Sequence, residues 1–227
     1  MTLTKKPLRR LLDMARRLID KDRVREQRRQ VRLLDALERK FAVKFRREII
    51  SASVLMIKGF KESGSVQNTP IDHAIKIADI YMQTVLVTFE VFGSRIIEQG
   101  KSAGLVLETK SFEDFFQRIA LEYLSSETLR RRIVGVSETT RNQIITAVSA
   151  GQAEGLSVAA IATNMARNIP AISRTRAALI SRTETHGAAN YGADAAARTL
   201  GLDLKKEWVA AFDERTRNAH MRADGQV

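Results

Sequence analysis

Apolar residues recur every three or four positions along most of the chain, which is the spacing of amphipathic helices. The pattern starts within residues 5–30, fades in the polar stretch 20–30, and returns over residues 31–60. It predicts a helix over 29–60, and it leaves open whether the polar stretch continues one helix or breaks it. The apolar positions are Leu8, Leu11, Leu12, Ala15, Leu18, Ile19, Val31, Leu34, Leu37, Phe41, Phe45 and Ile49.

The next stretch, residues 62–70, is rich in Gly, Ser, Asn and Pro and predicts a linker. Beyond it, the broadly apolar segment from Ile71 to about Gly100 predicts a second long helix that is buried on more than one side. Residues 101–110 are expected to connect it to a helix that begins at Ser111, with Asp114 as its capping partner.

The second half of the chain predicts several further helices. Residues 130–132 are three consecutive arginines, which cannot share one helix face, so we expect a solvated turn there. A helix is predicted over 137–150, ended by Gly151, and a short helix over 158–168, capped by Gly155, Leu156 and Ser157. Pro170 is expected to restart the chain into a long helix that Gly201 ends.

One segment is predicted to form a strand. Residues Asp203 to Phe212 alternate in part, and their aromatic and β-branched side chains favour a half-buried pleated surface. A polar loop with a turn at 223–225 follows. The predicted fold class is therefore mainly α, with long N-terminal helices and a helical domain that ends in a small strand/loop (α+β) element. Three regions are predicted: a basic helical arm at 1–62, a helical middle region at 63–150 and a motif domain at 151–227.

Positive charge is concentrated at the N-terminus. The chain has a formal net charge of +12, and residues 1–50 alone hold 17 basic and 7 acidic residues. Such an excess favours an anionic partner, either DNA or an acidic protein surface, although a solvated charged helix would read the same way. The candidate nucleic-acid contacts are Arg9, Arg10, Arg16, Arg17, Arg25, Arg28 and Arg29.

Composition excludes several classes of site and protein. The chain has no Cys, so it forms neither disulfides nor thiolate metal sites, which fits a protein made in a reducing cytosol. Its N-terminus is too charged for a signal peptide. The longest apolar segment, residues 71–97, is interrupted by charged residues, so no membrane span is expected.

The most distinctive residues lie in the last third of the chain. They are, in order, G-x-S-x-x-x-I-A from Gly155, I-S-R-x-R-A-x-x-I-x-R-T-E-T from Ile172, A-x-N-x-G from Ala188, K-x-W from Lys206 and D-x-R-T-R-x-x-H-x-x-A-D-G-Q from Asp213. As an ordered set, these motifs resemble the phage head-morphogenesis family, the minor head proteins of Mu-like and related tailed phages. Members usually continue into further strands and a Cys-containing ending, whereas this sequence ends at Val227.

The resemblance implies a structural minor head protein that is made in the host cytoplasm and carried in the virion. It implies docking at the portal vertex, in multiple copies around the portal protein, with contacts to the major capsid protein or the packaged DNA. No cofactor and no metal are implied.

The motif residues also suggest a network of contacts. A buried Arg182 or Glu184 in the middle of a helix would need a partner, and the natural partners are Asp213, Arg215 and Arg217 in the loop after the strand. We therefore expect one of the two to tie the long helix to that loop. The residues assigned to this structural motif are Arg182, Glu184, Trp208, Asp213, Arg215, Arg217, His220, Asp224 and Gly225.

A catalytic interpretation remains as the alternative. His220 with Asp213, Asp224 and Glu184 could form an acid/base set or a metal site, as in a metal-dependent hydrolase or transferase. The sequence has no H-E-x-x-H, nucleophile-elbow, P-loop or dinucleotide motif, so we expect no enzyme activity. The isolated His73 and His186 are expected to be ordinary helix residues.

Overall fold

The computed structural model describes residues 5–66, 71–102 and 112–201, together with Lys205, Trp208 and residues 217–226. Side chains are described from Val24 in the first helix, from His73 in the second and from Asp114 in the third. The described residues form α1 (Lys5–Ser63), α2 (Ile71–Ser102), α3 (Phe112–Leu124), α4 (Glu127–Ala153), α5 (Val158–Arg198) and α6 (Asn218–Ala223). Packing divides the chain into two compact units, Ala36–Leu202 and a second unit made of Met1–Asp35 with Asp203–Val227.

The mainly α prediction is confirmed for the described residues. The polar stretch 20–30 continues α1 without a break, which settles the alternative that the sequence left open. The predicted division at residues 62 and 150 stays a prediction, since the units above are defined by packing alone. No helix in the described ranges combines the length and apolarity that a membrane crossing requires.

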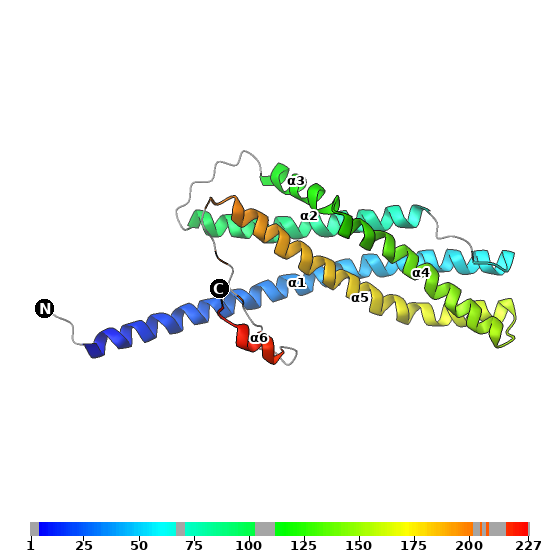
Figure 1. Ribbon diagram of the computed structural model, residues 1–227, viewed down its shortest axis with the longest axis horizontal. Helices are drawn as coiled ribbons and strands as arrows, with labels where there is room; N and C mark the ends of the chain where they lie inside the picture. The colour runs from blue at the N-terminus through cyan, green and yellow to red at the C-terminus, as the bar shows by residue number, and fades with distance from the viewer. Residues whose placement is uncertain are drawn as a thin grey trace. The chain divides into compact units, whose positions relative to one another are not determined.

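The larger unit is a bundle in which α2, α4, α5 and the later part of α1 run side by side, with α3 against α2 and α5 (Figure 1). Its core has three apolar clusters. One joins all four long helices around the fully buried Phe41, Phe45 and Ile77. A second lies between α1, α4 and α5 around Phe60 and Met165. The third joins α2, α3 and α5 around Phe89 and contains Phe116 and Ala188.

Close approach of α2 and α5 depends on two glycines. A Cβ on Gly192 of α5 would lie 3.0 Å from the Phe89 Cα of α2. A Cβ on Gly93 of α2 would overlap the ring of Phe116, which comes from α3. Bulk at either position would therefore force the helices apart where the third apolar cluster forms.

Two predictions about helix boundaries are wrong. Residues 130–132 are not a turn but lie inside α4, because Ser126 caps that helix by accepting from the Leu129 backbone N–H at 3.4 Å. Pro170 does not restart the chain but lies inside α5. A proline normally interrupts a helix, but here the buried Ile169 and Ser173 on either side keep α5 continuous.

The end of α4 also differs from the predicted helix end. Gly151 does not end its helix: it is buried within α4, where a Cβ would lie 2.6 Å from Ile161 Cγ1 of α5. The turn falls at Gly155, which adopts φ +70°. Ser157 then caps α5 as predicted, accepting from the Ala160 backbone N–H at 3.2 Å.

The glycine contact yields a stability prediction. Gly192→Ala should lower the free energy of unfolding by about 1–3 kcal/mol, because the added methyl meets backbone that cannot move aside. Gly135→Ala is the matched control: it also lies mid-helix, but its Cβ would meet nothing within 4 Å, so it should gain about 0.5–1 kcal/mol. Urea denaturation followed by circular dichroism measures both. Equal effects of the two substitutions would contradict this packing.

Candidate functional site

The basic residues of the predicted arm lie on the first half of α1. Arg9, Arg10, Arg16 and Arg17 fall in its helical backbone, and their side chains are outside the described residues. Arg28 and Arg29 are exposed, and no partner for either occurs in the described part of the chain. Arg25 is also exposed but makes a contact of its own. Two of the predicted cations are therefore positioned to meet an external anion.

Glu184, from the R-T-E-T motif, is a buried carboxylate at a junction of three helices. Only 3% of the residue is exposed. Its Oε1 accepts from the Tyr81 hydroxyl of α2 at 3.5 Å, and its Oε2 lies 3.5 Å from Arg132 Nη1 of α4. The carboxylate thus links α5 to α2 and α4.

Burial dominates the ionisation of this carboxyl. It raises the pKa of Glu184 above its ordinary value, and the charge of Arg132 offsets only part of that rise. The folded protein therefore holds the Glu184 proton more tightly than the unfolded chain does. As pH rises from the unfolded pKa through the folded pKa, ionising the group costs stability. Arg132 limits that cost at neutral pH.

The expected tie of Arg182 or Glu184 to the C-terminal loop stays a prediction. Tyr81 and Arg132, the described partners of Glu184, both belong to the bundle. Arg182 is exposed. Asp213 and Arg215, the other expected partners, lie outside the described residues. The sequence does carry a signal for the helix that holds Arg132, because Ser126 followed by Glu127 marks a helix start. Within that helix, Arg131 donates to Glu127, one turn earlier, at 2.8 Å. Arg132 faces α5, where it pairs with Glu184.

The two isolated histidines lie in helices, as predicted, and each meets a carboxylate of α1. His186 Nε2 lies 2.7 Å from Glu38 Oε1, and the Ser181 hydroxyl of the same helix donates to the Glu38 carbonyl. His73 Nδ1 lies 3.2 Å from Glu48 Oε1, and burial lowers the pKa of this imidazole. Both pairs fasten α1 to its neighbours.

A backbone pairing organises the C-terminal motif. The Trp208 N–H donates to the Gln226 carbonyl at 2.8 Å, and the Gly225 N–H donates to the Trp208 carbonyl at 2.9 Å. Two residues thus oppose one, and Gly225 has φ +79°. This is the geometry of a G1 β-bulge, whose first residue is a left-handed glycine. The D-G pair of the motif is therefore explained by a turn that folds back on Trp208.

The predicted strand is not found among the described residues. Of residues 203–212, only Lys205 and Trp208 are described, and neither is in a strand. The predicted turn is confirmed at Asp224 and Gly225. Around it, the Trp208 and His220 rings lie 5.3 Å apart at 59°. Arg217 is exposed and precedes α6, while Asp224 follows that helix.

The described residues hold no group of three His, Asp or Glu side chains arranged to bind a metal ion. Asp213, which the catalytic alternative requires, is outside those residues. The structure therefore places His220 beside an aromatic ring, and Glu184 in the bundle beside Tyr81 and Arg132.

The bulge yields a second prediction. Gly225→Ala should destabilise the Trp208 pairing by about 1–2 kcal/mol, because an alanine is strained at positive φ. Trp208 is the only tryptophan, so acrylamide quenching of its fluorescence should increase. Gly155→Ala, at φ +70° in the α4–α5 turn, carries the same strain and should leave that quenching unchanged. Identical quenching in wild type and Gly225→Ala would refute the bulge.

Comparison with known proteins gives one family. Residues 142–227 match the family model described as phage Mu protein F like protein. No curated protein and no solved structure matches the chain. The matched segment contains the motifs from Gly155 to Gln226, and the family is the one they predicted. It suggests a phage head morphogenesis protein, associated with the virion. The C-terminal third of this chain is thus similar to the phage Mu protein F like family.

Proposed function

We propose that the protein is a structural minor head protein of a tailed phage, which docks at the portal vertex and contributes to head assembly and to DNA packaging or ejection. The match of residues 142–227 to the phage Mu protein F like family carries this proposal. In this role the chain performs no reaction. It positions a helical body on the portal ring and presents a basic segment to an anion.

The use of the motif residues supports a structural role. Five residues of the α5 part of the motif are buried, with exposed fractions of 0–3%: Ser173, Ala177, Ser181, Glu184 and Thr185. Ile172, Arg174, Arg182 and Thr183 of the same motif are exposed. Ser181 and Glu184 join α5 to α1, α2 and α4. These two side chains are engaged within the bundle. They support a packing role for the buried part of the motif.

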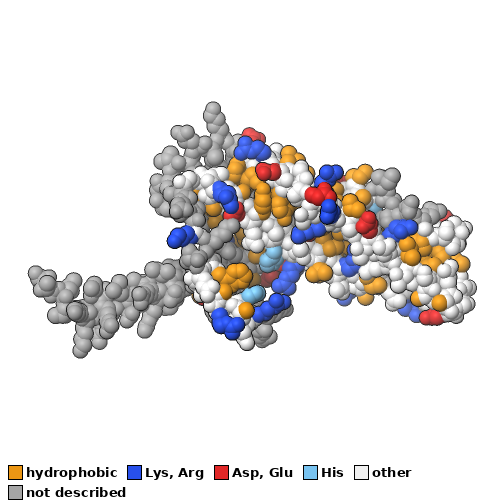
Figure 2. Space-filling model, viewed as in Figure 1, with side chains coloured by type: hydrophobic (Ala, Val, Ile, Leu, Met, Phe, Trp, Pro, Cys, Tyr) orange, Lys and Arg blue, Asp and Glu red, His pale blue; other side chains and the backbone are white. Residues whose placement is uncertain are grey.

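The charge distribution supports an anionic partner for the N-terminal segment. Residues 1–50 carry a large basic excess, whereas acidic and basic side chains are interspersed over the bundle face seen in Figure 2. Arginines on a helix contact phosphates without reading sequence, so binding to DNA would be electrostatic and sensitive to salt. An acidic surface of a portal or capsid protein would satisfy the same charges.

The hydrolase or transferase alternative has less support. It needs His220, Asp213 and Asp224 to converge, whereas the described contact of the His220 ring is with Trp208. No observation in the described residues favours it over the structural role.

The salt dependence of DNA binding distinguishes binding by the basic arm from non-specific binding by the rest of the surface. We expect the full chain to bind a random 30-base-pair duplex, with log K falling linearly against log salt. The double variant Arg28→Gln/Arg29→Gln should reduce the magnitude of that slope by about 0.9 for each phosphate that an arginine no longer neutralises. Arg130→Gln/Arg131→Gln is the matched control, since both arginines are exposed on α4, and its slope should not change. Fluorescence anisotropy measures all three proteins.

A binding experiment with the portal ring then identifies the partner of the basic segment. We expect the chain to co-purify with the ring and to remain there after nuclease treatment. Release by nuclease would mean that DNA alone holds it, and failure to bind the ring before treatment would contradict the proposed docking.

A further inference from the structure

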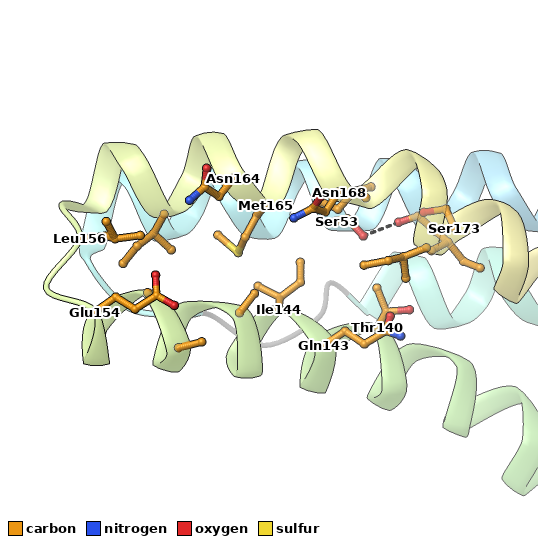
Figure 3. Close-up of a pocket in the computed structure, with 17 residues that line it drawn as sticks. Ser53, Thr140, Gln143, Ile144, Glu154, Leu156, Asn164, Met165, Asn168 and Ser173 are labelled. Atoms are coloured by element: carbon orange, nitrogen blue, oxygen red, sulfur yellow. Dashed lines mark hydrogen bonds between the residues drawn. The ribbon is translucent and has the colours of Figure 1, made fainter.

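A cavity of about 290 Å³ lies between α1, α4 and α5 (Figure 3). Its interior is apolar, with Ile49, Ile144, Ile161 and Met165 among the buried side chains that line it. Exposed residues of α4 and α5 form its rim, so a ligand could enter from the surface. The family motifs supply Ile161, Ile172 and Ser173 to its lining, and the head function proposed above gives this space no role.

One end of the cavity carries a hydroxyl without a partner. Ser173 is 0% exposed, and its Oγ makes no hydrogen bond to any described residue. The other two hydroxyls lining the cavity are satisfied by backbone carbonyls: Ser53 donates to Ile49 and Thr140 donates to Val136. A buried hydroxyl that lacks a partner is costly. An acceptor brought by a ligand would satisfy it.

The guanidinium of Arg176 lies behind the end of the cavity where Ser173 is. Arg176 Nη1 donates to Thr140 Oγ1 at 2.8 Å and to Gln143 Oε1 at 3.3 Å, and both acceptors line the cavity. Arg176 Nη2 donates to the Val136 carbonyl at 3.1 Å. All three acceptors are neutral, and within the described residues no carboxylate pairs with Arg176. Its half-burial lowers the pKa of the guanidinium, since the charge is poorly solvated.

The opposite end of the cavity carries a negative charge. Glu154 is the one charged residue among those lining the cavity. It lies directly after the end of α4, fourteen residues beyond Thr140, or about 21 Å away at 1.5 Å per residue. An anionic head group therefore belongs at the Ser173 end and an apolar tail in the interior.

We propose that this cavity binds a small amphipathic carboxylate, with its head group at Ser173 and Arg176 and its apolar chain between α4 and α5. The carboxylate accepts a hydrogen bond from the Ser173 hydroxyl. It accepts another from Arg176 Nη1 once the exposed Gln143 side chain swings outward. The volume is near the lower limit of small-molecule sites, about 300–1,000 Å³, so the apolar chain is short. This site does not depend on the proposed head function.

Calorimetric titration of the full chain with octanoate tests the proposal. Octanoate should bind, octanol should bind at least tenfold more weakly, and octylammonium should not bind detectably. Ser173→Ala should weaken octanoate binding about tenfold, because it removes one hydrogen bond to a charged group and no bond within the protein. Ala147→Leu, at an exposed lining position, should abolish binding by filling the cavity.

Ala166→Leu is the matched control, as an exposed alanine of α5 that does not line the cavity, and it should bind octanoate like the wild type. N-acetylleucine distinguishes the source: tighter binding than octanoate indicates the C-terminal residue of a protein, and weaker binding indicates a free amphiphile. The proposal is overturned if octanoate does not bind at millimolar concentration, if octanol binds equally well, or if Ser173→Ala has no effect.

Discussion

The bundle depends on burying one carboxylate where three helices meet. Water cannot solvate Glu184, which is 3% exposed, so the protein must do so. The Tyr81 hydroxyl of α2 donates to Oε1, and the Arg132 guanidinium of α4 pairs with Oε2 at 3.5 Å, where no hydrogen bond forms within the described residues. Neither can reach the carboxylate unless its helix has the right rotation and register. The requirement therefore fixes how α2 and α4 sit against α5, beyond what apolar packing alone specifies.

The helices could be predicted because their signals are local. Apolar spacing located α1 and α2, and Ser157 and Gly201 marked the two ends of α5. Two of the errors arose where tertiary packing overrode a local rule. Pro170 should break a helix, but the buried faces on either side of it hold α5 together. Three successive arginines favoured a turn because they cannot share one helix face, but on α4 Arg131 pairs with Glu127 of the same helix and Arg132 pairs with Glu184 of α5.

The contacts of Glu184 could not be predicted from the sequence. Glu184 was singled out as needing a partner, yet nothing local to it in sequence points to Tyr81, which is 103 residues away. The C-terminal turn was readable because Asp-Gly pairs have a strong backbone preference. Its pairing with Trp208 was not, since that depends on how the chain returns. The orphan hydroxyl of Ser173 and the guanidinium of Arg176 became visible only once α4 and α5 were placed together.

The motifs that define the family segment therefore divide between two physical tasks. Those on α5 hold the bundle together, and those after residue 203 fold the chain back around Trp208. The second set belongs to the same compact unit as the basic residues 1–35. Under the proposed function, the bundle would dock on the portal ring and the unit with the basic residues would meet the anion. The proposed head function is consistent with that division.

The direct measurement of the central claim is the unfolding free energy of Arg132→Gln, Glu184→Gln and the double variant at pH 7. Arg132→Gln should lose about 1–3 kcal/mol, less than the 3–5 kcal/mol of a fully buried pair because the Arg132 side chain is 44% exposed. Adding Glu184→Gln should restore most of that loss, since no buried charge is then left without a partner. A double variant no more stable than Arg132→Gln alone would contradict the account.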